Sequence, residues 1–363
     1  MEKSKSSRRI FLEKMASGGA AIALSGSIPA KLFAGTDRRP VPGGDPEQRE
    51  WTNESGKKFV PVMITPFEEK GGIDFNGLDR LIEFYLAAGV KGFFANCNSS
   101  EMYQLTNEER LSLAGHVVKK VNGKVSVVAT GSFGDTMEDK AEFAKKMYQT
   151  GVNAVILITS HYAGKEESDE VLFRNFENMC RLTGNMPLGF YECPSPYKRI
   201  INPGLFKQLL DTNRLIYFKD TSIDREKIRA KLALIKNNPM EFYDAHTPNA
   251  MFSLQLGAKG MACIAGNFYP EILAWMCNHA NDPAKREDVQ WLQAELTKAD
   301  PVISHHYPMS AKYFLHKRGV PVRAISRMSP AALSDTEKQT LDSMHDTLRG
   351  WQQRLGIQTD IKF

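Results

Sequence analysis

Lys219 closes a short apolar run at residues 215–219, and Tyr191 closes another at residues 188–191, 28 positions earlier in the chain. A lysine at the end of a buried strand loses hydration, which lowers its pKa and favours the neutral amine. The neutral amine is the form that attacks a ketone to give a Schiff base. A nearby phenol can relay the protons that this reaction moves. A strand-end lysine that reaches solvent is the commoner arrangement, so the surroundings of Lys219 decide which interpretation holds.

The elements that position these two residues follow a regular pattern. Between the apolar runs lie stretches with apolar residues three and four positions apart, which is the spacing of amphipathic helices. Eight strands alternating with helices over about 220 residues are typical of a (β/α)8 barrel; an open doubly wound sheet is the alternative, but no GxGxxG follows the first run. The expected strands are residues 59–64, 92–95, 125–130, 154–158, 188–191, 215–219, 242–244 and 261–264.

Beyond the last strand the pattern is helical only, with helices expected at residues 288–297, 301–318 and 334–355. We therefore expect the barrel to span residues 58–282 and a C-terminal helical extension to span residues 283–363. Residues 36–57 are rich in Pro, Gly and charge, and they are interpreted as a linker or an ordered arm.

Barrels of this class carry their chemistry where the strands end, so the polar residues that follow the strands are the candidates. They are Asn96, Asn98, Ser99, Ser132, Thr159, His161, Tyr191, Lys219, His246 and Thr247.

Three local motifs are consistent with one another: Asn98-Ser99-Ser100-Glu101, Tyr191 with Pro194, and Lys219-Asp220. Together they resemble the dihydrodipicolinate synthase and N-acetylneuraminate lyase family of class I aldolases, from about residue 59 to the C-terminus. The resemblance implies that Lys219 forms a Schiff base with pyruvate or another 2-oxo acid, and that Tyr191 shuttles protons. It also implies that Ser99 supplies a hydroxyl that positions this tyrosine. The substrate-binding positions that it implies are Asn98, Ser100, His246, Thr247 and Ala262.

Several residues depart from the family pattern. Cys97, Asn98 and Ser100 replace two glycines and a hydroxyl of the loop motif. Pro196 stands where the synthase branch has an arginine that grips the second substrate, although Lys198 and Arg199 follow closely and are candidates to replace it. The loss of this arginine, together with the export signal described below, favours the lyase branch. Family members form dimers or tetramers in which a neighbouring subunit supplies a tyrosine, so a homo-oligomer is expected.

Tyr162 is the candidate for that inter-subunit relay. Thr247 is equally well explained as a helix N-cap, and His246 as a surface histidine.

The first 35 residues are interpreted as a twin-arginine export signal. Arg8-Arg9-Ile10-Phe11-Leu12 and Lys14 precede a mild apolar stretch that is too short and too rich in small residues to be a spanning anchor. This segment holds six basic and two acidic residues and accounts for most of the formal net charge of +5, so the remainder does not indicate a nucleic-acid-binding protein. A periplasmic location is therefore expected.

Five cysteines form no CxxC and are odd in number, which argues against a disulfide framework. A soft-metal site remains an alternative, since thiols and imidazoles follow several strands, but no short ligand spacing supports it. Its members would be Cys97, Cys193, Cys263, His161 and His246.

The sequence thus predicts an exported, cofactor-free and metal-free class I aldolase or lyase that makes or cleaves a C–C bond to pyruvate. A 2-keto-3-deoxy sugar acid or a sialic-acid-like compound is the favoured substrate. The alternatives are 4-hydroxy-tetrahydrodipicolinate synthase, which joins pyruvate to aspartate semialdehyde, and a non-catalytic barrel that binds a 2-oxo acid.

Overall fold

The computed structural model describes residues 56–329 and 331–357. The predicted export signal at residues 1–35 and almost all of the predicted linker lie outside this part of the chain. Within it, no helix is both long enough and apolar enough to span a bilayer.

Eight parallel strands form a single sheet in the order β1-β8-β7-β6-β5-β4-β3-β2. A parallel bridge between Val62 and Phe94 joins the segment after β1 to β2 and completes the ring, so the predicted (β/α)8 barrel is confirmed. The strands are β1 (Lys58–Phe59), β2 (Gly92–Phe94), β3 (Ser126–Thr130), β4 (Ala154–Ile158), β5 (Leu188–Tyr191), β6 (Leu215–Asp220), β7 (Glu241–Asp244) and β8 (Gly260–Met261).

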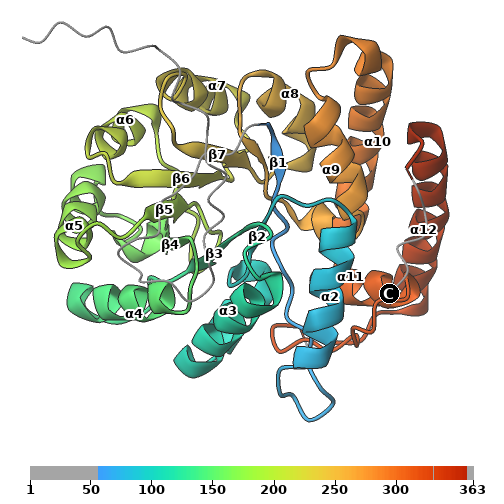
Figure 1. The fold of residues 1–363 in the computed structure, drawn as a ribbon, viewed down its shortest axis with the longest axis horizontal. Coiled ribbons are helices and arrows are strands. Elements are labelled where there is room, and N and C mark those ends of the chain that lie inside the picture. Colours follow the sequence, from blue (N-terminus) through green and yellow to red (C-terminus); the bar gives the residue numbers. More distant parts are fainter. Residues whose placement is uncertain (1–55, 330, 358–363) are drawn as a thin grey trace, which may run out of the picture. The chain divides into compact units, whose positions relative to one another are not determined.

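Helices alternate with these strands around the barrel (Figure 1). Side-chain caps fix the first turns of several of them: the hydroxyl of Thr106, for example, accepts from Glu109 N, and the Glu109 carboxylate accepts from Thr106 N. The barrel helices are α2 (Phe75–Ala87), α3 (Asn107–Val121), α4 (Met137–Gln149), α5 (Asp169–Leu182), α6 (Pro203–Asp211), α7 (Arg225–Leu234), α8 (Ala250–Gln255) and α9 (Pro270–His279).

The C-terminal helices are α10 (Arg286–Ser304), α11 (Met309–Lys317) and α12 (Asp335–Leu355), and Figure 1 shows them gathered on one side of the barrel next to α9. The predicted helical extension is confirmed, but its internal break was misplaced. Pro301 was expected to begin a helix, yet it lies inside α10, and the chain breaks at residues 305–308 instead. His306 there has a φ of 52°, which ends an α-helix.

The first and last strands are shorter than expected. Pro61 has no N–H to donate, so regular β1 pairing stops at Phe59 and only the isolated bridge at Val62 continues it. β8 ends at Met261, and of the residues expected to continue it only Ile264 belongs to the short helix η6 (Ile264–Asn267).

Side chains alternate between the inside of the barrel and the helix layer. Phe218 of β6 faces outward, since its ring centre lies 4.8 Å from that of Phe206 on α6. Tyr217 and Lys219 on either side of it therefore face inward. The interior is tightly packed beneath the strand ends: a Cβ added to Gly189 would lie 2.7 Å from the Cβ of Tyr217. This packing holds the last inward residues of β5 and β6 in defined places.

Candidate active site

Lys219 and Tyr191 are neighbours across the β5–β6 ladder, where they occupy paired positions at the carboxyl ends of the strands. The Lys219 ammonium nitrogen lies 4.1 Å from the centre of the Tyr191 ring and 5.4 Å from that of Phe94. Both side chains are buried, with 4% of each residue exposed. The two residues singled out first from the sequence are thus brought together inside the barrel.

Burial sets the protonation states of this pair. Loss of hydration lowers the pKa of Lys219, against the opposing influence of the Cys97, Cys193 and Cys263 thiols. Burial also raises the pKa of Tyr191 well above its usual value, so the phenol keeps its proton near neutral pH. An amine that loses its proton readily beside a phenol that keeps it is the arrangement needed for nucleophilic attack on a ketone.

The loop after β2 passes from Cys97, which acts electrostatically on both Lys219 and Tyr191, into a short 3-10 helix, η2 (Asn98–Ser100). Asn98 is half-buried and Ser99 is buried. Ser100 is fully buried, and its hydroxyl donates toward the carbonyls of Met63 and Ala95 at 2.7 and 3.0 Å. Ser100 therefore holds the loop in shape through its hydroxyl rather than presenting that group to a substrate.

The C-terminal helices support the same loop. Buried Glu101 has a φ of 60°, and its carboxylate forms an ion pair with Lys312 of α11 at 2.5 Å. The Ser99 hydroxyl interacts with the hydroxyl of Tyr307, which accepts a hydrogen bond from Asn267 Nδ2 at 2.7 Å. Tyr307 was missed in the sequence because it follows no strand; only its distance from Ser99 in space reveals it.

A second group of polar side chains, Tyr103 and His161, is linked to Tyr191 through Cys193. The Tyr103 hydroxyl is 2.6 Å from the Ser195 carbonyl and 3.1 Å from Nε2 of His161, while Nδ1 of His161 lies 2.7 Å from the Ser132 carbonyl. A carbonyl only accepts, so Nδ1 carries the proton and Nε2 is an acceptor. Burial lowers the pKa of His161, which favours this neutral form. The single proton of Tyr103 thus has two acceptors. Tyr103 also interacts with Cys193, which in turn interacts with Tyr191.

His246 and Thr247 follow β7 as expected, and Thr247 is 1% exposed. Within the described residues, Nδ1 of His246 and the hydroxyl of Thr247 are buried without a hydrogen-bond partner. Asp300 of α10 acts electrostatically on His246 and lies near Thr247, although no well-formed hydrogen bond joins them. Thr247 does not cap a helix through its side chain, so that interpretation is not supported. Ala262 is fully buried and donates its N–H to the Asp244 carbonyl at 3.0 Å.

Tyr162 lies apart from this group. Its ring is 1% exposed and packs edge-to-face against Phe190, an outward residue of β5, with ring centres 5.6 Å apart. Within the single chain it is buried beside the helix layer, and its role as an inter-subunit relay stays a prediction.

Neither basic residue after Pro196 takes up an arginine's role at the site. The Arg199 guanidinium donates to the carbonyls of Gly164 and Glu167 and pairs with Asp169, all at 2.9 Å. Lys198 is exposed. Arg199 thus fixes the loop after β4 through its two terminal nitrogens, while its Nε is buried without a hydrogen-bond partner among the described residues.

The alternative metal site finds no support in the described residues: no three His, Cys, Asp or Glu side chains there are placed to ligate one ion. The five cysteines are free thiols, and four of them are buried.

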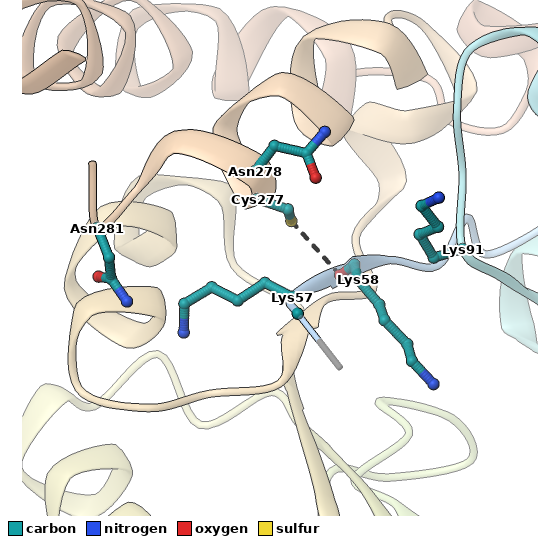
Figure 2. Close-up of a pocket in the computed structure, with 7 residues that line it drawn as sticks. Lys57, Lys58, Lys91, Cys277, Asn278 and Asn281 are labelled. Atoms are coloured by element: carbon teal, nitrogen blue, oxygen red, sulfur yellow. Dashed lines mark hydrogen bonds between the residues drawn. The ribbon is translucent and has the colours of Figure 1, made fainter. Parts of the chain in front are cut away.

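A cavity of about 360 Å³ lies at the other end of the barrel, where the strands begin (Figure 2). It is lined by Gly56, Lys57, Lys58, Lys91, Cys277, Asn278 and Asn281. These residues lie at the start of β1, just before β2, or at and just after the end of α9, so this cavity is separate from the Lys219 site.

Comparison with known proteins agrees with this geometry. The model of the dihydrodipicolinate synthetase family matches residues 56–348. The chain belongs to this family. The 4-hydroxy-tetrahydrodipicolinate synthase of Oceanobacillus iheyensis is 26% identical over 287 residues, covering 79% of this chain and 95% of the relative. The Bacillus subtilis enzyme of the same name is 28% identical over 291 residues, covering 78% of this chain and 96% of the relative.

Solved structures show the same fold. A prophage protein of the dihydrodipicolinic acid synthase family from E. coli K12, crystallised with pyruvate, superposes with a TM-score of 0.73 at 22% identity, covering 81% of this chain and 98% of the other. A dihydrodipicolinate synthase structure gives a TM-score of 0.71 at 25% identity, with 81% and 99% covered. Members of this family are pyruvate-dependent class I aldolases and lyases, so the fold and the general chemistry agree with the sequence prediction.

Proposed function

We propose that this chain is a pyruvate-dependent Schiff-base aldolase in which Lys219 is the nucleophile and Tyr191 the proton carrier. The observation that supports this most strongly is the buried Lys219 amine 4.1 Å from the Tyr191 ring, at the carboxyl ends of adjacent strands. Burial lowers the pKa of this amine, as the first step of imine formation requires.

The steps of the reaction follow from the amine of Lys219 and the phenol of Tyr191. The neutral Lys219 amine adds to the keto carbon of pyruvate, and Tyr191 protonates the carbinolamine oxygen so that it leaves as water. The resulting iminium withdraws electrons from the adjacent methyl carbon, which loses a proton and becomes a nucleophilic enamine. Addition of this carbon to an aldehyde forms the C–C bond, and the reverse sequence cleaves it. Hydrolysis of the imine then frees Lys219.

We propose a 2-keto-3-deoxy sugar acid or a sialic-acid-like compound as the substrate. Pro196 replaces the arginine of the synthase branch, and Arg199 is held by the loop after β4 and by Asp169 at the start of α5. His246 and Thr247, which follow β7, have polar atoms without a hydrogen-bond partner in the described part of the chain, and hydroxyl groups of a substrate would satisfy them. The names of the curated relatives favour the in-class alternative, condensation of pyruvate with aspartate semialdehyde.

Pyruvate release from a panel of 2-keto-3-deoxy acids and N-acetylneuraminate, measured beside condensation with aspartate semialdehyde, separates these two substrates. Lys219→Ala serves as the control for the Schiff base. Turnover of aspartate semialdehyde alone would assign the synthase activity.

The non-catalytic alternative, a barrel that binds a 2-oxo acid, is motivated by the altered loop at residues 97–100. A binding protein would retain saturable affinity for pyruvate in Lys219→Ala and show no turnover. An aldolase would lose both the imine and its activity in that variant.

We further propose that the chain is exported through its twin-arginine segment and assembles as a homo-oligomer. Export is tested by fusing residues 1–35 to a reporter and comparing it with an Arg8→Lys/Arg9→Lys fusion. Sedimentation of the folded chain measures the number of subunits.

A further inference from the structure

The residues that directly follow Tyr191 and Lys219 are both acidic, and a lysine of the helix layer joins them. Nζ of Lys231, on α7, lies 2.7 Å from Oε1 of Glu192 and 2.7 Å from Oδ2 of Asp220. All three side chains have no exposed surface. Because side chains alternate along strands, these carboxylates point away from the barrel interior that Lys219 and Tyr191 face. Nζ of Lys231 also lies 4.8 Å from the ring centre of the outward residue Phe218.

The carboxylate of Glu192 connects three segments of the chain through hydrogen bonds. Oε1 also accepts from Ile201 N at 2.9 Å, and Oε2 accepts from Thr221 N at 2.8 Å. The Thr221 hydroxyl donates back to the Glu192 carbonyl at 2.6 Å. Glu192 thereby links the end of β5 to the start of α6 and to the loop that follows β6.

Asp220 is fixed in the same way. Its Oδ1 accepts from the backbone N–H and the hydroxyl of Ser222 at 2.7 and 2.6 Å, which leaves Oδ2 for Lys231. The neighbouring carboxylate, Asp244 on β7, accepts from Ser253 and from His246 N instead. Lys231 is therefore the ammonium that faces two buried carboxylates at the ends of the two catalytic strands.

A buried ion triad of this kind adds little to stability compared with well-packed apolar side chains, whereas removing one partner leaves an uncompensated charge. Its main consequence here is geometric. Small displacements of reacting groups cost rate steeply, so a device that fixes both strand ends acts on catalysis without touching the substrate.

We propose that Lys231 is a positioning residue of the Schiff-base site: by bridging Glu192 and Asp220 it fixes Tyr191 and Lys219 relative to each other and compensates carboxylate charge behind the lysine. This inference rests on the proposed aldolase function.

The test compares Lys231→Met with Lys58→Met. Lys58 forms another buried ion pair, with Glu241 at 2.8 Å, but at the end of the barrel where the strands begin (Figure 2). Each variant loses a buried ammonium of similar setting. We measure thermal unfolding and the rate at which pyruvate and borohydride label Lys219. Lys231→Met should slow labelling about tenfold or more, whereas Lys58→Met should change it less than about twofold, since distant sites act independently.

The pH profile separates the two parts of this role, charge compensation and positioning. Burial raises the pKa of Glu192 to about 7 and that of the neighbouring Asp244 carboxyl to about 7, so in Lys231→Met the carboxylate charge that remains behind Lys219 should move the labelling profile to higher pH. Loss of positioning alone would lower the rate at every pH without a shift. The groups that face Lys219 itself, the thiols of Cys97, Cys193 and Cys263, are unchanged in this comparison.

A double variant, Glu192→Gln/Lys231→Met, restores the net charge of the triad and tests the proposal if Lys231→Met does not fold. It should label slowly, because the strand ends are no longer joined, but with the wild-type pH profile. Labelling within about twofold of wild type in the folded single or double variant would overturn the inference while leaving the aldolase intact. Absence of labelling in the wild type would refute the proposed function instead, and the inference with it.

Discussion

Replacing Tyr191 by Phe removes one hydroxyl from the site and keeps its packing. The ring stays 5.7 Å from Phe94 and 4.1 Å from the Lys219 ammonium, so the apolar surroundings that lower the lysine's pKa persist. The proton carrier is lost. General acid–base catalysis contributes about 10²–10⁴-fold to rate, which corresponds to about 3–5 kcal/mol of transition-state stabilisation. We therefore expect kcat for pyruvate release to fall by that factor.

Stability should hardly change in this variant. The Tyr191 hydroxyl is deeply buried and interacts with the Cys193 thiol, a weak partner, so its removal should alter the free energy of unfolding by about 1 kcal/mol or less. The matched control is Tyr217→Phe, which removes a buried hydroxyl that has no hydrogen-bond partner among the described residues, also from an inward position of the barrel. A Tyr191→Phe protein that turns over at the rate of Tyr217→Phe would refute the role given to Tyr191.

Three further predictions follow from the described contacts. Because burial lowers the pKa of Lys219 below 10.5, the rate of imine formation should rise as the pH passes through that lowered pKa. A trapping rate that rises only at pH 10.5 or above would contradict this. Gly189→Ala should destabilise the fold by about 1–3 kcal/mol in urea unfolding, since its Cβ would lie 2.7 Å from that of Tyr217. An unchanged unfolding midpoint would show that the strands move apart at little cost in free energy. Lys312→Met leaves Glu101 buried without its ammonium and should cost about 3–5 kcal/mol by the same assay, and a loss below 1 kcal/mol would mean that Ser326 and the backbone N–H groups suffice.

The barrel and its central pair were predictable because their signals are local. Each inner strand is a short apolar run between helical stretches, and the final residues of two such runs, Tyr191 and Lys219, necessarily meet when the strands pair in parallel. The ends of the strands and helices were less predictable. Proline at position 61 interrupts pairing inside an apolar run, and the break near Pro308 was assigned to Pro301, because a proline alone does not reveal whether a helix accommodates it.

Supporting residues escaped prediction because their partners are distant in sequence. Tyr307 meets Ser99 across more than two hundred positions, and Lys231 occupies a helix position where a lysine ordinarily faces solvent. Tyr162 was chosen for its nearness to a strand end, and its ring packs against Phe190, an outward residue of β5.

The central claim, a nucleophilic Lys219, is tested most directly by the intact mass of the protein after borohydride reduction with pyruvate, followed by peptide mapping. The account predicts a single adduct of reduced pyruvate on Lys219 that is absent from Lys219→Ala. A folded protein that gains no adduct, or that is labelled equally in Lys219→Ala, would contradict it.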